Sequence, residues 1–111
     1  MAERIKLVQG DDLPNVRLAL SDAVSATPID LSDPDTVVRV HFRAQGEEQV
    51  LATIVCAKVA GGSAGEVQFN FAPNLLDVEP GAYEAEIEID FGGLTHTVYD
   101  PLKFSVRAQF A

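Results

Sequence analysis

The sequence predicts an all-β protein, an antiparallel β-sandwich of seven or eight strands. The main observation is one segment in which apolar and acidic residues alternate without a break: Tyr83, Glu84, Ala85, Glu86, Ile87, Glu88, Ile89, Asp90 and Phe91. Successive side chains of a strand point to opposite sides of the sheet, so this order fits a strand with one buried face. Short alternating runs recur elsewhere between clusters of Gly, Pro, Asp and Ser, a spacing typical of sandwiches rather than of βαβ units.

The first three strands are expected at Arg4–Gln9, Asn15–Ser21 and Thr36–Ala44. Within each of them apolar residues lie two positions apart and share one face. The residues predicted to point inward are Ile5, Leu7, Val16, Leu18, Leu20, Val38, Val40 and Phe42. Turn-forming residues from Gly10 to Pro14 separate the first two strands, and a loop rich in Asp and Pro precedes the third.

The fourth run, Gln49–Ala60, is apolar on both faces between Val50 and Ala57. Its β-branched residues favour a strand over a helix. A strand that is apolar on both faces must be covered twice. The sequence leaves two covers open: the loop Asp22–Asp35 of the same chain, or a neighbouring protein molecule.

The remaining strands are expected at Glu66–Phe71, between Pro80-Gly81 and Gly92-Gly93, at Leu94–Tyr99 and at Leu102–Phe110. Their predicted inward residues outside the acidic strand are Val67, Phe69, Phe71, Leu102, Phe104, Val106, Ala108 and Phe110. The connections are predicted to be a flexible turn at Gly61–Gly65, a short helical turn within Ala72–Glu79 that crosses between the sheets, and a kink or bulge at Pro101.

Length and charge restrict the class of protein. Residues 1–111 are expected to form a single domain that buries a core without disulfides or a metal. Eight Lys and Arg against seventeen Asp and Glu give a net charge of −9, which disfavours nucleic acid and anionic membranes as partners. The start of the chain has no apolar segment of signal-peptide length, so we expect a soluble protein without an export signal. The single cysteine, Cys56, is expected to be a small buried hydrophobe rather than a reactive thiol.

The row Glu84, Glu86, Glu88 and Asp90 places carboxylates on one sheet face and invites a metal or acid–base assignment. Hydrolases with paired carboxylates set their acids across a cleft, whereas these would lie side by side on an open face. Cross-strand ion pairs explain the row better. The basic residues expected to neutralise it occupy outward positions on other strands: Arg39, Arg43, Lys103, Arg107 and, less directly, Arg17.

No catalytic, cofactor-binding or metal-ligating residue is predicted. The segment Asp30–Asp35, with Asp11-Asp12 elsewhere, could supply oxygens to calcium, but its spacing matches no EF-hand loop and turn capping is the simpler use. The only histidines, His41 and His96, have no cysteine or second histidine at ligand spacing. The chain also lacks a Gly-x-Ser-x-Gly elbow and a phosphate-binding loop with its lysine.

Tyr83 begins a long strand after an irregular crossing, the position of a tyrosine corner, in which the ring is buried and the hydroxyl bonds to upstream backbone. The other aromatics predicted to point inward include Phe91 and Phe110, which leaves only Tyr99 unassigned. The chain has no Trp. A carbohydrate-binding platform would therefore have almost no exposed aromatic ring to use.

Six short segments carry a resemblance to a known family: Ile5–Asp11, Val16–Asp22, Pro28–Ser32, Val37–Val40, Pro80–Tyr83 and Gly92–Thr95. Taken in order, they resemble the N-terminal domain of the tailed-phage baseplate upper protein family. In that family a Gly-Asp follows the first strand, a Leu-Ser or Leu-Thr precedes the third, and a Gly-x-Tyr occurs late in the domain. Gly10-Asp11, Leu31-Ser32 and Gly81-Ala82-Tyr83 stand at these places here.

The resemblance implies an immunoglobulin-like β-sandwich that serves as a non-catalytic virion structural or assembly protein of a phage or prophage, in the tail, baseplate or neck. It implies other phage structural proteins as partners, in a homo-oligomer or ordered assembly, with no cofactor, nucleic acid or membrane. The protein would be made in the bacterial cytoplasm and reside in the virion. The alternative is a stand-alone carbohydrate- or receptor-binding sandwich that decorates a particle.

Overall fold

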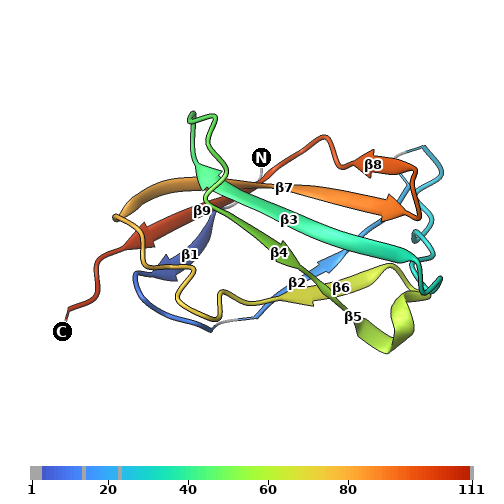
Figure 1. The fold of residues 1–111 in the computed structure, drawn as a ribbon, viewed down its shortest axis with the longest axis horizontal. Helices are drawn as coiled ribbons and strands as arrows, with labels where there is room; N and C mark the ends of the chain where they lie inside the picture. Colours follow the sequence, from blue (N-terminus) through green and yellow to red (C-terminus); the bar gives the residue numbers. More distant parts are fainter. Residues whose placement is uncertain (1–3, 14, 23, 111) are drawn as a thin grey trace.

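The computed structural model describes residues 4–13, 15–22 and 24–110. The start of the chain and Pro14, both used in the sequence predictions, lie outside these residues. The described chain forms a β-sandwich without an α-helix (Figure 1). Its strands are β1 (Ile5–Val8), β2 (Val16–Ala19), β3 (Thr36–Ala44), β4 (Ala52–Val55), β5 (Ala57–Lys58), β6 (Glu66–Phe69), β7 (Gly81–Phe91), β8 (Thr95–Thr97) and β9 (Leu102–Arg107). None of the described segments is a helix long and apolar enough to cross a membrane.

Two sheets make up the sandwich. The larger has the order β1-β9-β7-β3-β4, with β8 also paired to β7, and the smaller has the order β2-β6-β5. The acidic strand β7 lies between β9 and β3 (Figure 1). The register places Arg43 and Lys103 on either side of Glu84. Alternation of side chains predicted the buried face of β7, and cations expected to pair with its acidic row lie on both neighbouring strands.

One pairing corrects the antiparallel prediction, because β1 runs parallel to β9. Ile5 lies beside Phe104 and Val8 beside Arg107, and the ladder continues through the Gln9 N–H, which donates to the Arg107 carbonyl. Side chains alternate in the same way in parallel and antiparallel strands, so the sequence pattern placed β1 correctly and could not give its direction.

The run Gln49–Ala60 forms two strands instead of one, which raises the number of described strands to nine. The Cys56 N–H still donates to the Val38 carbonyl of the larger sheet, whereas the next residue, Ala57, pairs with Gln68 of the smaller sheet. The chain therefore crosses between the sheets at Cys56. Ile54 and Cys56 point into the core from this crossing.

The segment predicted as a flexible turn is instead closely packed. A 3₁₀ turn spans Val59–Gly62, and Gly62 and Gly65 are both buried. The Gly65 carbonyl accepts the Leu20 N–H, and a Cβ at Gly65 would lie 2.4 Å from the Leu20 carbonyl oxygen. Because Gly65 also has a φ of 75°, only glycine fits both the conformation and the close approach.

Of the other two predicted irregularities, one is confirmed. The crossing from β6 to β7 contains a hydrogen-bonded turn, in which the Leu75 N–H donates to the Phe71 carbonyl, but it is not the predicted helical turn because Asn74 within it has a φ of 57°. The predicted kink or bulge at Pro101 is present. A bulge separates β8 from β9 at Tyr99–Pro101. The Val98 N–H donates to the Ile87 carbonyl and Leu102 pairs with Ala85, so the three residues of the bulge stand opposite Glu86 alone.

The core is organised around five aromatic rings. Phe42 lies 5.2 Å from Tyr83 in a stacked arrangement and 5.6 Å from both Phe71 and Phe104, edge to face. Phe69 contacts Phe71 in the same way at 5.6 Å. These rings come from β3, β7 and β9 of one sheet and from β6 and the residues just after it in the other. They therefore join the two sheets.

The predicted inward position is wrong for Phe91 and Phe110, which are 40% and 93% exposed. Phe91 is the last residue of β7, at the hairpin end of the sheet. Phe110 lies beyond the end of β9 at Arg107, and the Arg107 guanidinium lies 4.6 Å from the centre of its ring. Alternation along a strand does not predict burial at positions where the covering sheet ends or where the strand itself has ended.

Tyr83 forms the predicted tyrosine corner. Its ring is buried, and its hydroxyl donates to the Glu79 carbonyl four residues upstream. Burial raises the pKa of this hydroxyl above its ordinary value. The hydrogen bond ties the crossing segment to the start of β7.

We expect Tyr83→Phe to lower the free energy of unfolding by about 0.5–1.5 kcal/mol, because the variant loses one hydrogen bond and leaves the Glu79 carbonyl without that donor. Urea denaturation with an unchanged slope would measure the loss. Tyr99→Phe is the matched control, since that ring is 95% exposed and its variant should be neutral. Equal denaturation midpoints for wild type and Tyr83→Phe would contradict the corner.

Candidate interaction site at an open sheet edge

The acidic row is largely neutralised by neighbouring strands. Glu84 accepts from Arg43 at 2.7 Å and from Lys103 at 3.2 Å. The hydrogen bond from Arg43, more than that from Lys103, lowers the pKa of the Glu84 carboxyl against the opposing effect of burial. Arg39 lies 3.3 Å from Asp90 and 3.6 Å from Glu88. These contacts use the row for cross-strand ion pairing, as the sequence indicated.

Two of the predicted basic partners lie elsewhere. Arg17 pairs with Glu66 of the smaller sheet at 3.3 Å, because β2 belongs to that sheet. Arg107 lies over the Phe110 ring and donates to the Ala108 carbonyl. Glu86 is exposed and stands opposite the bulge, where the strand that would place a cation beside it is interrupted. The described residues form no ion pair with Glu86.

The Asp-rich loops are built by turn chemistry. Asp30 and Asp33 accept the N–H groups of Ser32 and Asp35, each two residues on. Asp12 accepts the Asn74 N–H. Hydrogen bonds from Ser32 lower the pKa of Asp30. Among the residues that the structure describes, no three His, Cys, Asp or Glu side chains converge on a metal-binding position.

The histidines and the cysteine form no catalytic group with each other. His41 contacts the Thr53 hydroxyl through Nδ1 at 3.0 Å and lies 3.5 Å from Glu88 through Nε2. His96 is exposed on β8. Cys56 is buried, and burial raises the pKa of its thiol to about 12. A thiolate nucleophile is therefore disfavoured at this position.

The apolar run around β4 is exposed on its outer side. Val55 is 64% exposed, and Val50 and Leu51 are each 47% exposed. The loop Asp22–Asp35 does not cover them, which removes one of the two covers that the sequence left open. This loop lies at the end of the sandwich near the β7–β8 hairpin (Figure 1), where Leu31 bonds to Gly62 and Asp33 to Lys58.

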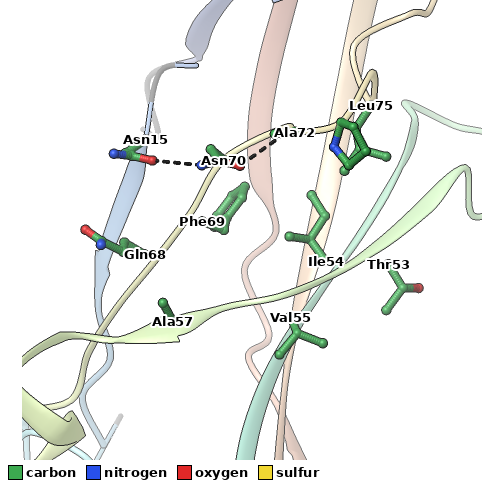
Figure 2. Close-up of a pocket in the computed structure, with 11 residues that line it drawn as sticks. Asn15, Thr53, Ile54, Val55, Ala57, Gln68, Phe69, Asn70, Ala72 and Leu75 are labelled. Atoms are coloured by element: carbon green, nitrogen blue, oxygen red, sulfur yellow. Dashed lines mark hydrogen bonds between the residues drawn. The ribbon is translucent and has the colours of Figure 1, made fainter. Parts of the chain in front are cut away.

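A groove of about 450 Å³ follows this edge. It lies between β4 of the larger sheet and the end of β6 with the turn after it. Figure 2 shows Ile54 and Phe69 on the same side of β4, with Val55 pointing the other way. The groove is lined by Asn15, Thr53, Ile54, Val55, Ala57, Gln68, Phe69, Asn70, Ala72, Pro73 and Leu75. Among the described residues no charged side chain lines it, in a chain with a net charge of −9.

Sequence reasoning found one wall of this groove and missed the other. The apolar run Val50–Ala57 marked β4 as a strand in need of a cover. Asn15 lies just before β2, whereas Asn70 and Leu75 lie in the connection after β6, and no sequence pattern links them. Their side chains meet at the groove because Asn70 donates to the Asn15 amide oxygen and the turn after β6 folds back beside β4 (Figure 2).

Comparison with known proteins gives one informative result. No protein-family model and no curated protein matches this sequence. Among solved structures, the fold is similar to the N-terminal domain of phage TP901-1 ORF48, with a TM-score of 0.55 and 15% sequence identity. The match covers 96% of this chain and 85% of that one. The two chains share a fold over nearly their whole length.

We expect Glu84→Gln to destabilise the protein by about 1–2 kcal/mol, since it weakens hydrogen bonds to two cations. Glu86→Gln is the matched control and should cost well under about 1 kcal/mol, because an exposed carboxylate without an ion pair contributes little. Chemical denaturation of both variants near neutral pH would measure the difference.

The Glu84 effect should also depend on pH. Its pKa is lowered in the folded protein, so its stabilisation is present above the unfolded pKa of about 4.3 and is lost as the pH falls through the lower folded value. The gap between wild type and Glu84→Gln should therefore narrow from about pH 5 downward. A constant gap, or divalent-ion binding in calorimetry that Glu86→Gln abolishes, would contradict this interpretation of the row.

Proposed function

We propose that this protein is a non-catalytic structural domain of a phage or prophage virion that acts through protein–protein contacts. The observation that carries the proposal is the fold shared with a phage protein domain over 96% of the chain. The resemblance of short sequence segments to the N-terminal domain of the baseplate upper protein family agrees with it. The proposed partners are other phage structural proteins, and the proposed location is the tail, baseplate or neck of the particle.

The proposed fold class is an immunoglobulin-like sandwich formed by residues 1–111 as one domain. The tyrosine corner at Tyr83 supports this assignment, since it is a hallmark of such sandwiches. The central position of β7 between β9 and β3 and the aromatic core between two sheets are consistent with it. The parallel pairing of β1 with β9 is an addition to the purely antiparallel order that the sequence suggested.

The chemistry of the described side chains favours contacts over catalysis. The acidic residues with lowered pKa values are held by cations or backbone N–H groups, and the buried thiol is protonated at neutral pH. One feature without an internal role is the exposed apolar edge at β4, where Val50, Leu51 and Val55 lie close together in sequence. An uncovered edge of this kind is characteristic of a protein that meets a partner.

The carbohydrate-binding alternative gains little from the exposed aromatics. Tyr99 lies beside Arg43 and Glu84, Phe91 beside Ile29 and His96, and Phe110 against Arg107. Because these rings occupy three separate places, they do not form one flat platform for a sugar chain.

The proposed function predicts that the protein is a component of purified particles from the phage or lysogen that encodes it. Quantitative mass spectrometry of gradient-purified particles should find it at a fixed ratio to the major tail protein. A deletion should give particles that lack a tail part or fail to infect. Its absence from purified particles, with normal infectivity of the deletion, would refute the function.

A second prediction concerns the β4 edge. Thr53→Lys should reduce incorporation into particles while leaving the monomer folded, because Thr53 is exposed on the outer side of β4. Thr97→Lys is the matched control, an exposed strand threonine on the same sheet away from β4. In a competition between variant and wild-type copies, equal incorporation of both lysine variants would show that contacts lie elsewhere.

A further inference from the structure

We propose that the groove beside β4 receives an extended, uncharged segment of a different protein chain, which adds to the sheet as a new edge strand. This inference rests on the proposed function and names the kind of partner that the assembly contact requires. Strand addition of this kind takes its affinity from main-chain hydrogen bonds and its specificity from pockets for alternate side chains.

Part of the β4 backbone has hydrogen-bonding groups that point away from the sheet. The Cys56 N–H points toward β3, where it donates to the Val38 carbonyl. Successive residues of a strand direct their backbone groups to opposite sides, so those of Val55 and Thr53 point away from β3. Within the described chain, β4 pairs with β3 alone. The outer edge of β4 is therefore available to pair with another strand.

The opposite wall of the groove, formed by β6 and the residues after it, offers a second backbone position that is free to form a hydrogen bond. The Leu20 N–H donates to the Gly65 carbonyl, and the Phe71 N–H donates to the Asp12 carbonyl, so odd-numbered residues of this stretch face the β2 side. Gln68 faces the other way and pairs with Ala57, the first residue of β5, directly after the crossing at Cys56. Asn70 is the next residue to face that way, into the groove, beyond the last pair of β5 and β6.

β4 differs from the other edge strands of the two sheets in its lack of charged or titratable residues. Exposed edges are normally protected by charge, proline or a bulge. A charged or titratable residue occurs on each of the other four edge strands: Lys6 on β1, Arg17 on β2, Lys58 on β5 and His96 on β8. β4 reads Ala-Thr-Ile-Val and has none. It is the one described edge strand without such protection.

The lining of the groove indicates which kind of chain segment can bind in it. The groove has no charged lining residue, so a segment inside it must be uncharged. Ile54, Phe69 and Leu75 provide an apolar floor, which suits a strand with an apolar residue at every second position. A second copy fits poorly. The inward residue of its own β4, Ile54, is already buried in its core, as is Cys56 at the crossing, and each copy carries a charge of −9.

The experiment uses the isolated protein and a synthetic peptide in which threonine and valine alternate between terminal lysines. The control peptide has the same composition with its valines in one block. In ¹⁵N-resolved NMR titrations, the alternating peptide should shift the amides of Thr53, Val55 and Asn70. The block peptide should bind roughly tenfold more weakly, because it cannot place apolar side chains at alternate positions.

Two variants sharpen the test. Thr53→Pro removes one outward N–H and should weaken alternating-peptide binding roughly tenfold. Val55→Lys gives β4 the charge that other edges have and should weaken binding even if the proline variant does not fold. Thr97→Lys should bind the peptide as the wild type does.

Three results would overturn the inference. They are equal binding of the two peptides, amide shifts confined to surfaces away from β4, and self-association that protects the Thr53 and Val55 amides in place of the peptide. The last result would assign the groove to a second copy. Because these measurements need no particle, their failure is separate from the mass-spectrometric test of the virion role.

Discussion

The aromatic cluster around Phe42 is the interaction on which the rest of the structure depends. Phe42 is fully buried near the end of β3 and contacts rings from β7, from β9 and from the residues just after β6. Aromatic pairs at these separations add about 0.5–1.5 kcal/mol each beyond the burial of their area. The cluster therefore fixes the spacing of the two sheets at one end of the sandwich.

The position of the groove follows from this cluster and from the crossing at Cys56. The chain leaves the larger sheet at Cys56 and joins the smaller one at Ala57, so that one continuous segment forms an edge of both sheets. Phe69 and Phe71 hold the end of β6 against the core while β4 continues along β3. The two sheets are thus joined at the crossing. On the β4 side of the crossing they leave a groove between them, and Ile54 forms part of its floor.

The outer face of the larger sheet and its β4 edge differ in charge. The charges on the face are mostly ion-paired, whereas the edge has no charge and its outward backbone groups have no partner within the described chain. On the outer face of the larger sheet, Arg39, Arg43 and Lys103 neutralise most of the acidic row of β7. That face needs no partner, and its chemistry suits an exposed surface in an acidic protein. The β4 edge has free backbone groups and exposed apolar side chains instead, which agrees with a role in an assembly of protein chains.

The sequence by itself determined the strands and their buried faces, because alternation along a strand is a local property. The nine residues of β3, the register of β7, the Tyr83 corner and the bulge at Pro101 all follow from neighbouring residues. The sequence also identified Arg43 and Lys103 as cations that pair with the acidic row containing Glu84, since opposite charges on neighbouring strands attract.

Only the tertiary structure decided where strands end relative to their neighbours. The direction of β1, the crossing at Cys56 and the exposure of Phe91 and Phe110 depend on segments distant in sequence. The same holds for the groove, whose walls come from β4 and from residues 68–75. Local periodicity indicates that β4 has two apolar faces. It cannot show which of them the rest of the chain leaves open, because that depends on the packing of the whole sandwich.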